Sequence, residues 1–193
     1  LQNIIIKNKT TTEPIGNTPK LNRGDINAIS KIIEDVDYIT GLSMTKEDVR
    51  AVSLVNDVEI IGTYPNYFKI FDLGLKAGGY FSNLDNKYQN RVCVLGKKIA
   101  KDVLKLKAQP GQEIKINDQW FKVVGILNYK PVQSSGGSQF NFNNNIFIPF
   151  ETLRLRFEKD PKNPELKQVV AHINHRDNVM GSSGVIEQIL YRR

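Results

Sequence analysis

The 193-residue sequence is predicted to form a globular α+β domain. Its composition, 40% hydrophobic and 24% charged residues, is that of chains that fold around an apolar core. Short β-branched runs between residues 37 and 63 have the period of two that is typical of strands. Each end of the chain carries a strand pattern, a polar stretch and an amphipathic helical pattern, so helices and strands are mixed without regular alternation.

The N-terminal part begins with a strand pattern and continues into a helical one. Asn3 to Lys7 is rich in β-branched residues, and the polar stretch from Asn8 to Lys20 predicts a loop. Asn22 is a good N-cap residue, followed three positions later by an acid. Apolar residues then recur at helical spacing at Ile26, Ile29, Ile32, Ile33 and Val36. We expect a helix that packs one apolar face against the domain.

A meander of three strands is predicted next. The β-rich runs are Tyr38 to Met44, Val49 to Val55 and Val58 to Gly62. Polar residues at Lys46 to Asp48 and at Asn56 and Asp57 separate them, which predicts a turn at each place.

A short helix and a polar loop are expected between residues 63 and 90. Thr63 is a capping residue and Pro65 suits a first helical turn, so the helix should run to Phe71 with Phe68 and Phe71 facing the core. A turn at Gly78 and Gly79 then leads into Ser82 to Asn90, whose polarity predicts a loop.

The middle of the chain predicts a strand, a basic helix and a hairpin. The helix covers Lys97 to Lys105, and its lysines fit a solvated helix face as well as a binding surface. The hairpin strands are Glu113 to Ile116 and Gln119 to Leu127. Gly125 within the second strand predicts a bulge or a close backbone approach.

The segment from Pro131 to Asn145 predicts a mobile surface loop, because it is rich in Ser, Gly and Asn. Phe140 and Phe142 stand within it. Two apolar rings in a segment too polar to pack suggest a partner contact; alternatively, both rings fold back onto the domain. After it, the sequence predicts a strand at Ile146 to Ile148 and a helix at Glu151 to Phe157. A strand at Gln168 to Asn174 and a helix at Ser183 to Tyr191 complete the chain.

No residue pattern indicates catalysis or cofactor binding. The lone Cys93 lies in a strand pattern, where a buried apolar role is expected. The two histidines, His172 and His175, are too few for a zinc site. Gly96 and Lys97 lack the spacing of a phosphate-binding loop. We therefore predict a non-enzymatic domain with no metal and no cofactor.

The sequence contains no apolar run of the roughly 20 residues that span a bilayer. It begins at Leu1 without a signal-peptide pattern. We interpret it as a water-soluble fragment excised from a longer protein. The net charge of +7 would favour anionic partners, but the lysines are scattered.

Three stretches together resemble the MacB-like periplasmic core domain of FtsX-type permeases. The first is Ile61-Gly-Thr-Tyr-Pro-Asn-Tyr-Phe68, continued through Gly79-Tyr-Phe81. The second is Arg91-Val-Cys-Val-Leu-Gly96. The third joins Pro110-Gly-Gln-Glu-Ile-Lys-Ile116 to Phe121-Lys-Val-Val-Gly-Ile-Leu127, and Ile146-Phe-Ile-Pro149 completes the series.

The resemblance implies two subdomains and a mechanical function. A porter-like α/β sandwich would be formed by residues 1–60 and 160–193, with a β-rich, sabre-like insertion at 61–159. The domain would face the periplasm from the bacterial inner membrane, in an ABC transporter whose permease forms a homodimer and whose cytoplasmic ATPase is separate. It would transmit ATP-driven change to a periplasmic adaptor or a lipoprotein cargo during export or efflux. Such a role requires both chain ends at a common base, so Asn3 to Lys7 and Gln168 to Asn174 should share one sheet.

Two other functions remain open at this stage. A permease of the same fold could release lipoproteins or regulate cell-wall hydrolases. The other alternative is a different kind of protein, a basic module that binds glycan or nucleic acid. The sequence lacks the aromatic pattern of nucleic-acid-binding domains, so we expect no nucleic-acid partner.

Overall fold

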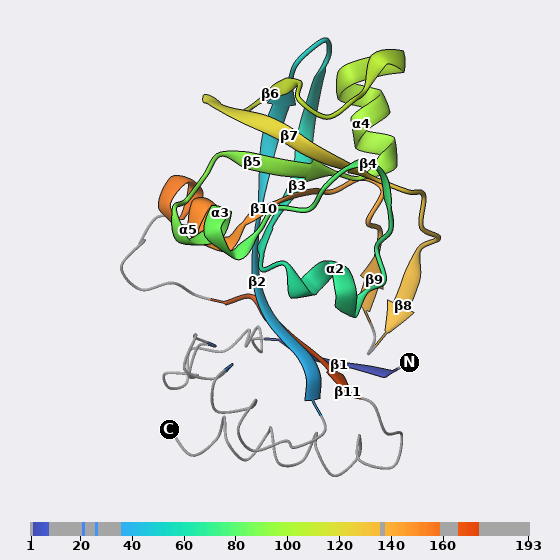
Figure 1. The fold of residues 1–193 in the computed structure, drawn as a ribbon, viewed down its shortest axis with the longest axis vertical. Helices are drawn as coiled ribbons and strands as arrows, with labels where there is room; N and C mark the ends of the chain where they lie inside the picture. The colour runs from blue at the N-terminus through green and yellow to red at the C-terminus, as the bar shows by residue number, and fades with distance from the viewer. Residues whose placement is uncertain are drawn as a thin grey trace, which may run out of the picture.

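The computed structural model describes residues 2–7, 21, 26, 36–135, 138–158 and 166–173 (Figure 1). Its strands are β1 (Gln2–Lys7), β2 (Val36–Arg50), β3 (Leu54–Thr63), β4 (Leu75–Gly78), β5 (Val92–Leu95), β6 (Glu113–Ile116), β7 (Gln119–Leu127), β8 (Gln133–Ser135), β9 (Ser138–Phe140), β10 (Ile146–Pro149) and β11 (Gln168–Ile173). Its helices are α2 (Asn66–Ile70), α3 (Asn83–Lys87), α4 (Lys97–Leu104), the 3-10 turn η1 (Lys105–Lys107) and α5 (Phe150–Phe157). Mixed helices and strands confirm the α+β class.

Most strands belong to one nine-stranded sheet with the order β1-β11-β2-β3-β10-β5-β7-β4, and β6 bridges β2 and β7. The pairs β10 with β3 and β5 with β7 are parallel, while the other pairs in the sheet are antiparallel. The strands β8 and β9 form a separate two-stranded sheet.

Both faces of the central strands are buried, which explains their apolar sequences. In β5, Cys93 and Leu95 belong to the cluster that includes α4, whereas Val94 belongs to the cluster that includes α2. In β10, Ile146 and Ile148 join the first cluster and Phe147 joins the second. Because side chains alternate along a strand, α4 and α2 cover opposite faces of the sheet.

The prediction that the N-terminal and C-terminal strands share one sheet is confirmed. β1 and β11 are antiparallel neighbours, and Gln2 is the register partner of Ile173. β11 in turn pairs with the first half of β2, from Val36 to Leu42. The predicted N- and C-terminal strands therefore share one sheet.

The prediction of separate strands at 38–44 and 49–55 is wrong, because β2 runs unbroken from Val36 to Arg50. The chain turns between Arg50 and Leu54, and β3 pairs back along β2. Asn56 and Asp57 form a bulge instead of a turn. Asp57 has a φ of 54°, and its backbone N–H donates to Asp48 Oδ1 at 3.2 Å. Two residues of β3 therefore lie opposite the single residue Asp48 of β2, and both strands continue past the bulge.

Three further local predictions need correction. Thr63 is the last residue of β3, where its hydroxyl donates to the Gly41 carbonyl, and Pro65 occupies the N-cap of α2. The expected loop at 82–90 contains α3, which begins with a capping box between Ser82 and Asp85. The strand β4 was not predicted, because its four residues are too few to show the alternation of apolar and polar residues that is typical of strands.

Other predictions are confirmed. The hairpin strands β6 and β7 have the expected bounds, and Phe68 and Phe71 are 2% and 3% exposed. Gly125 lies at a register shift between β5 and β7. A Cβ atom there would lie 2.2 Å from the Gly79 carbonyl oxygen, so the close approach requires glycine.

The expected helices near residues 22–36 and 183–191 lie mostly outside the described residues. Val36, predicted as the end of the first helical stripe, instead begins β2. The expected subdomain boundary at residue 60 falls within β3, and the division itself stays a prediction. Among the described residues, none of the helices has the length and apolar character needed to cross a bilayer.

Candidate functional site: an aromatic arm anchored on a short helix

The predicted loop, Pro131 to Asn145, belongs to an arm, residues 128–145, which connects β7 to β10. It contains the β8–β9 hairpin, in which Gln133 pairs with Phe140 and Ser135 with Ser138. Figure 1 shows this hairpin beside α2, on the side of the domain away from α5. The predicted surface loop therefore contains a short hairpin in its described part, and its mobility stays a prediction.

One asparagine joins the two legs of the arm at its root. The Asn143 side-chain oxygen accepts the backbone N–H of Lys130 at 3.0 Å, and its amide nitrogen donates to the Lys130 carbonyl. The Asn143 side chain thus forms hydrogen bonds with both the N–H and the carbonyl of Lys130, as the backbone of a neighbouring strand would. Asn143 is 5% exposed, so solvent competes little for these bonds.

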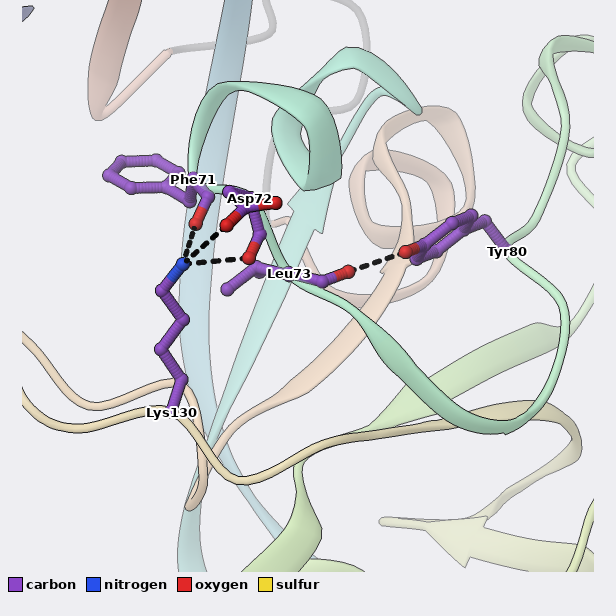
Figure 2. Close-up of polar contacts among 5 residues, drawn as sticks. All are labelled: Phe71, Asp72, Leu73, Tyr80 and Lys130. Atoms are coloured by element: carbon purple, nitrogen blue, oxygen red, sulfur yellow. Dashed lines mark hydrogen bonds and ion pairs between the residues drawn. The ribbon is translucent and has the colours of Figure 1, made fainter. Parts of the chain in front are cut away.

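Lys130 fixes this root to the end of α2 (Figure 2). Its ammonium donates to the carbonyl oxygens of Phe71 at 2.6 Å and Asp72 at 2.7 Å, and lies 3.6 Å from Asp72 Oδ2. Phe71 is the C-cap of α2 and Asp72 follows it, so the Lys130 ammonium lies at the C-terminal end of the helix, where backbone carbonyls carry partial negative charge. Figure 2 also shows the Tyr80 hydroxyl reaching the next carbonyl, that of Leu73, to which it donates at 2.5 Å.

The two phenylalanines of the arm occupy different environments. Phe142 is 2% exposed, and its ring centroid lies 5.1 Å from that of Phe71 and 6.4 Å from that of Tyr67. Phe140 is half-buried and stacks on Phe142 at 5.9 Å, with an interplanar angle of 11°. Phe142 is therefore a core residue, and its burial removes it from direct partner contact. A partner contact through the half-buried Phe140 stays a prediction.

The return leg of the arm also caps α4. The Asn143 carbonyl accepts the backbone N–H groups of Lys98 and Ile99, each at 3.0 Å, and Gly96 donates to the Asn145 carbonyl at 2.9 Å. A Cβ atom at Gly96 would lie 2.2 Å from the Phe142 carbonyl oxygen. The absence of a side chain at Gly96 lets the arm meet the helix. The arm consequently links α2, on one face of the sheet, to α4, on the other.

The ionisable groups around the arm favour structural roles. Burial, together with the negative charge of Asp72, raises the pKa of Tyr80, so its hydroxyl stays a neutral donor. Burial also raises the pKa of Tyr67, with a smaller contribution from Glu59. Cys93 is 0% exposed, and burial raises the pKa of its thiol, which confirms the expected apolar role.

The two histidines of the sequence differ in what the structure describes of them. His172 lies half-buried in β11, and His175 lies outside the described residues. Among the residues that the structure describes, no group of three His, Cys, Asp or Glu side chains could hold a metal ion. The roles of Lys130, Asn143 and Tyr80 were not predicted, because they arise from tertiary contacts that no local sequence pattern encodes.

Comparison with known proteins identifies the family of this domain. The model of the MacB-like periplasmic core domain matches residues 2–180. This chain belongs to that family. The resemblance inferred from the three sequence stretches is confirmed, and the domain is of the kind found in MacB-like ABC transporter permeases.

Curated relatives match over part of their length. The pyoverdine export ATP-binding/permease protein PvdT of Pseudomonas fluorescens is 34% identical over 111 residues, which cover 57% of this chain and 16% of that protein. The macrolide export ATP-binding/permease protein MacB of Syntrophobacter fumaroxidans is 28% identical over 97 residues, covering 50% of this chain and 13% of the relative. The matched stretches thus span less than a fifth of these two proteins.

Solved structures share the fold. The extracellular domain of the noncanonic ABC-type transporter YknZ from Gram-positive bacteria has a TM-score of 0.75 at 18% identity, covering 98% of this chain and 92% of that one. The periplasmic region of MacB from Actinobacillus actinomycetemcomitans has a TM-score of 0.74 at 17% identity, covering 96% and 80%. The α+β fold of this chain is therefore the fold of these extracytoplasmic domains.

Proposed function

We propose that this chain is the extracytoplasmic domain of an export permease and that it carries ATP-driven movement from the membrane to an adaptor or cargo. The observation that supports this best is the pairing of Gln2 with Ile173, which brings the two described ends of the chain to one end of the sheet. Membrane helices attached beyond these strands would then move a common base.

A long strand offers a rigid path away from that base. β2 has 15 residues, which corresponds to about 50 Å of extended chain. Its first half pairs with β11, and its second half pairs with β3 and β6. A displacement of β11 would therefore reach the opposite end through backbone hydrogen bonds instead of through a loop.

The rest of the transporter completes the proposal. ATP hydrolysis would occur in a separate cytoplasmic ATPase domain or subunit, and a second permease copy would form a homodimer. The domain would face the periplasm from the bacterial inner membrane. Residues 1–60 and 160–193 would form the porter-like base, and residues 61–159 the sabre-like insertion. A periplasmic adaptor or a lipoprotein cargo would contact Phe140 on the arm.

Spin labels on the complete transporter in lipid vesicles would test the movement. Asp118, at the turn between β6 and β7, has a side chain that is 90% exposed, and Lys167, just before β11, is also exposed. Cysteines at these two positions can be labelled while the buried Cys93 stays unmodified. We expect the Asp118–Asp118 distance between copies to change on ATP binding, and the Asp118–Lys167 distance within one copy to stay constant.

The opposite pattern would contradict the proposal. A distance between copies that does not respond to ATP would mean that the domain transmits no movement. A change confined to the distance within one copy would mean that the domain deforms instead of moving as a body. An ATPase-inactive variant of the transporter, which binds but does not hydrolyse ATP, separates the binding step from hydrolysis.

A further inference from the structure

The helix α4 and the turn η1 form a strongly basic surface at the end of the domain opposite β1 (Figure 1). Five exposed lysines occur within eleven residues, against the single acid Asp102. They are Lys97, Lys98, Lys101, Lys105 and Lys107. Within the described part of the chain, none of the five makes an ion pair. Their charge is therefore available to a partner.

An exposed leucine stands among these lysines. Leu106 is 93% exposed and lies between Lys105 and Lys107 in η1. Lys105, the residue that redirects the chain out of α4, has a φ of 63°, which is strained for a residue with a side chain. Strain of this kind persists where the surrounding structure enforces it, often at sites of function.

Two more exposed apolar residues lie beside this turn. Val52, in the turn between β2 and β3, is 69% exposed, and Leu54, the first residue of β3, is 48% exposed. The backbone N–H of Ser53, between them, donates to the carbonyl of Val103 in α4 at 3.1 Å. Figure 1 shows the β2–β3 turn and α4 together at the end of the domain opposite β1. We name Val52, Leu54, Leu106, Lys101, Lys105 and Lys107 the distal patch.

We propose that the distal patch docks an acidic protein surface that offers an apolar pocket to Leu106. An apolar centre with a polar or charged rim is the usual composition of a protein-binding site. Because the lysines of the rim have no acidic partners, their positive charge favours a partner surface with negative charge. A second copy of this chain would bring like charges together. An anionic polymer would satisfy the lysines but leave the three apolar side chains in water.

The inference rests on the proposed function in one respect, the orientation that points the distal patch away from the membrane. In that orientation the patch reaches a partner that approaches the far end of the domain. The β8–β9 hairpin of the arm, with Phe140, remains a separate candidate contact, because it lies beside α2 on the other face of the sheet.

A photo-cross-linking amino acid in the complete transporter would test the distal patch in cells. A benzoyl-phenylalanine at position 106 is the probe, and the same residue at position 84 is the control, because Leu84 in α3 is 62% exposed and its helix carries one acid, Asp85, and one base, Lys87, instead of a cluster of lysines. We expect an adduct with another protein at position 106 only. Its cross-linked peptide should map to a surface with an excess of Asp and Glu.

Titration of the purified partner against this chain completes the test. Leu106→Ser should weaken binding at least about fivefold, as for a buried anchor, and Leu84→Ser should not. Replacing Lys101, Lys105 and Lys107 together by Gln should weaken binding about tenfold at low salt, with a smaller effect at high salt.

Several results would overturn the inference. They are an adduct with the second copy, with lipid or with a glycan, an adduct no stronger at position 106 than at 84, or a partner surface without acidic excess. Binding that is insensitive to Leu106→Ser would do the same. The spin-label distances between copies report movement independently, so either proposal can fail while the other holds.

Discussion

Lys130 is the residue on which the arm's attachment to α2 depends most. Replacing it with Met keeps the length of the side chain but leaves the carbonyls of Phe71 and Asp72 without their cationic donor. We expect Lys130→Met to lower the free energy of unfolding by about 1.5–3 kcal/mol, the range for hydrogen bonds to a charged group. Urea denaturation measures this change.

Lys97→Met is the matched control for that prediction. Lys97 is exposed and its ammonium lies 6.0 Å from the centroid of the Tyr129 ring, a weak contact at the surface. Its replacement should change the free energy of unfolding by less than about 0.5 kcal/mol. Equal effects of the two substitutions would show that the Lys130 bonds contribute nothing specific.

The two phenylalanines of the arm should differ in the same experiment. Phe142→Ala removes a ring that is 2% exposed and should lower the free energy of unfolding by about 3–5 kcal/mol. Phe140→Ala removes a half-buried ring, so the loss should be clearly smaller, and the circular dichroism spectrum should be unchanged. A larger loss for Phe140 than for Phe142 would contradict the assignment of Phe142 to the core.

At the scale of single elements, α3 contains a pH-dependent cap. Burial alone would raise the pKa of Asp85, but hydrogen bonds from Asn90 and Ser82 outweigh it and lower the pKa. A carboxyl with a lowered pKa in the folded state stabilises that state at neutral pH, and this contribution is lost as the pH falls below its ordinary value of about 4. Asp85→Asn should cost about 1 kcal/mol at pH 7.

The pH dependence of that difference is the decisive measurement. Thermal unfolding of the native protein and of Asp85→Asn should give well-separated midpoints at pH 7 and a smaller separation at pH 3, because the native carboxyl takes up a proton as the pH falls. Lys87→Ala on the same helix should show no such convergence. A constant difference between the native protein and Asp85→Asn at both pH values would exclude a role of the carboxylate charge.

Most elements could be predicted because their patterns are local. The strands β6 and β7 alternate apolar and polar residues around a two-residue turn, and α4 carries an apolar stripe, so sequence alone defines both. β2 could not be predicted as one strand, because its polar residues 46–48 lie in the sheet with β3 as their partner. Only the tertiary pairing distinguishes a polar bulge from a turn.

The arm marks the limit of prediction more clearly. Its composition favours a loop, yet the buried Asn143 and Phe142 connect α2 to α4. Asparagine is common in loops, and nothing in the sequence indicates that one of these side chains replaces a strand partner for Lys130. The role of such a residue depends on a contact between segments that are distant in sequence.

At the scale of the whole molecule, the pairing of the chain ends predicts a specific cross-link. Asn3 and His172 are register partners in β1 and β11, so their Cα atoms should lie about 4.5–5.5 Å apart, within the range of a disulfide. Asn3→Cys with His172→Cys should oxidise readily and raise the unfolding midpoint. The offset pair Asn3→Cys with Lys167→Cys should not form, because Lys167 precedes the pair of Lys7 with Gln168 at the other end of the strands.

The same cross-link tests whether the two ends move as one unit in the complete transporter. If β1 and β11 form a common base, joining them covalently removes no motion that transport needs, and ATP-driven export should continue at its native rate. Reduction of the disulfide should then change nothing. Export that stops on oxidation and recovers on reduction would show that the ends must separate during the cycle, and the base would then act as a hinge instead of a rigid support.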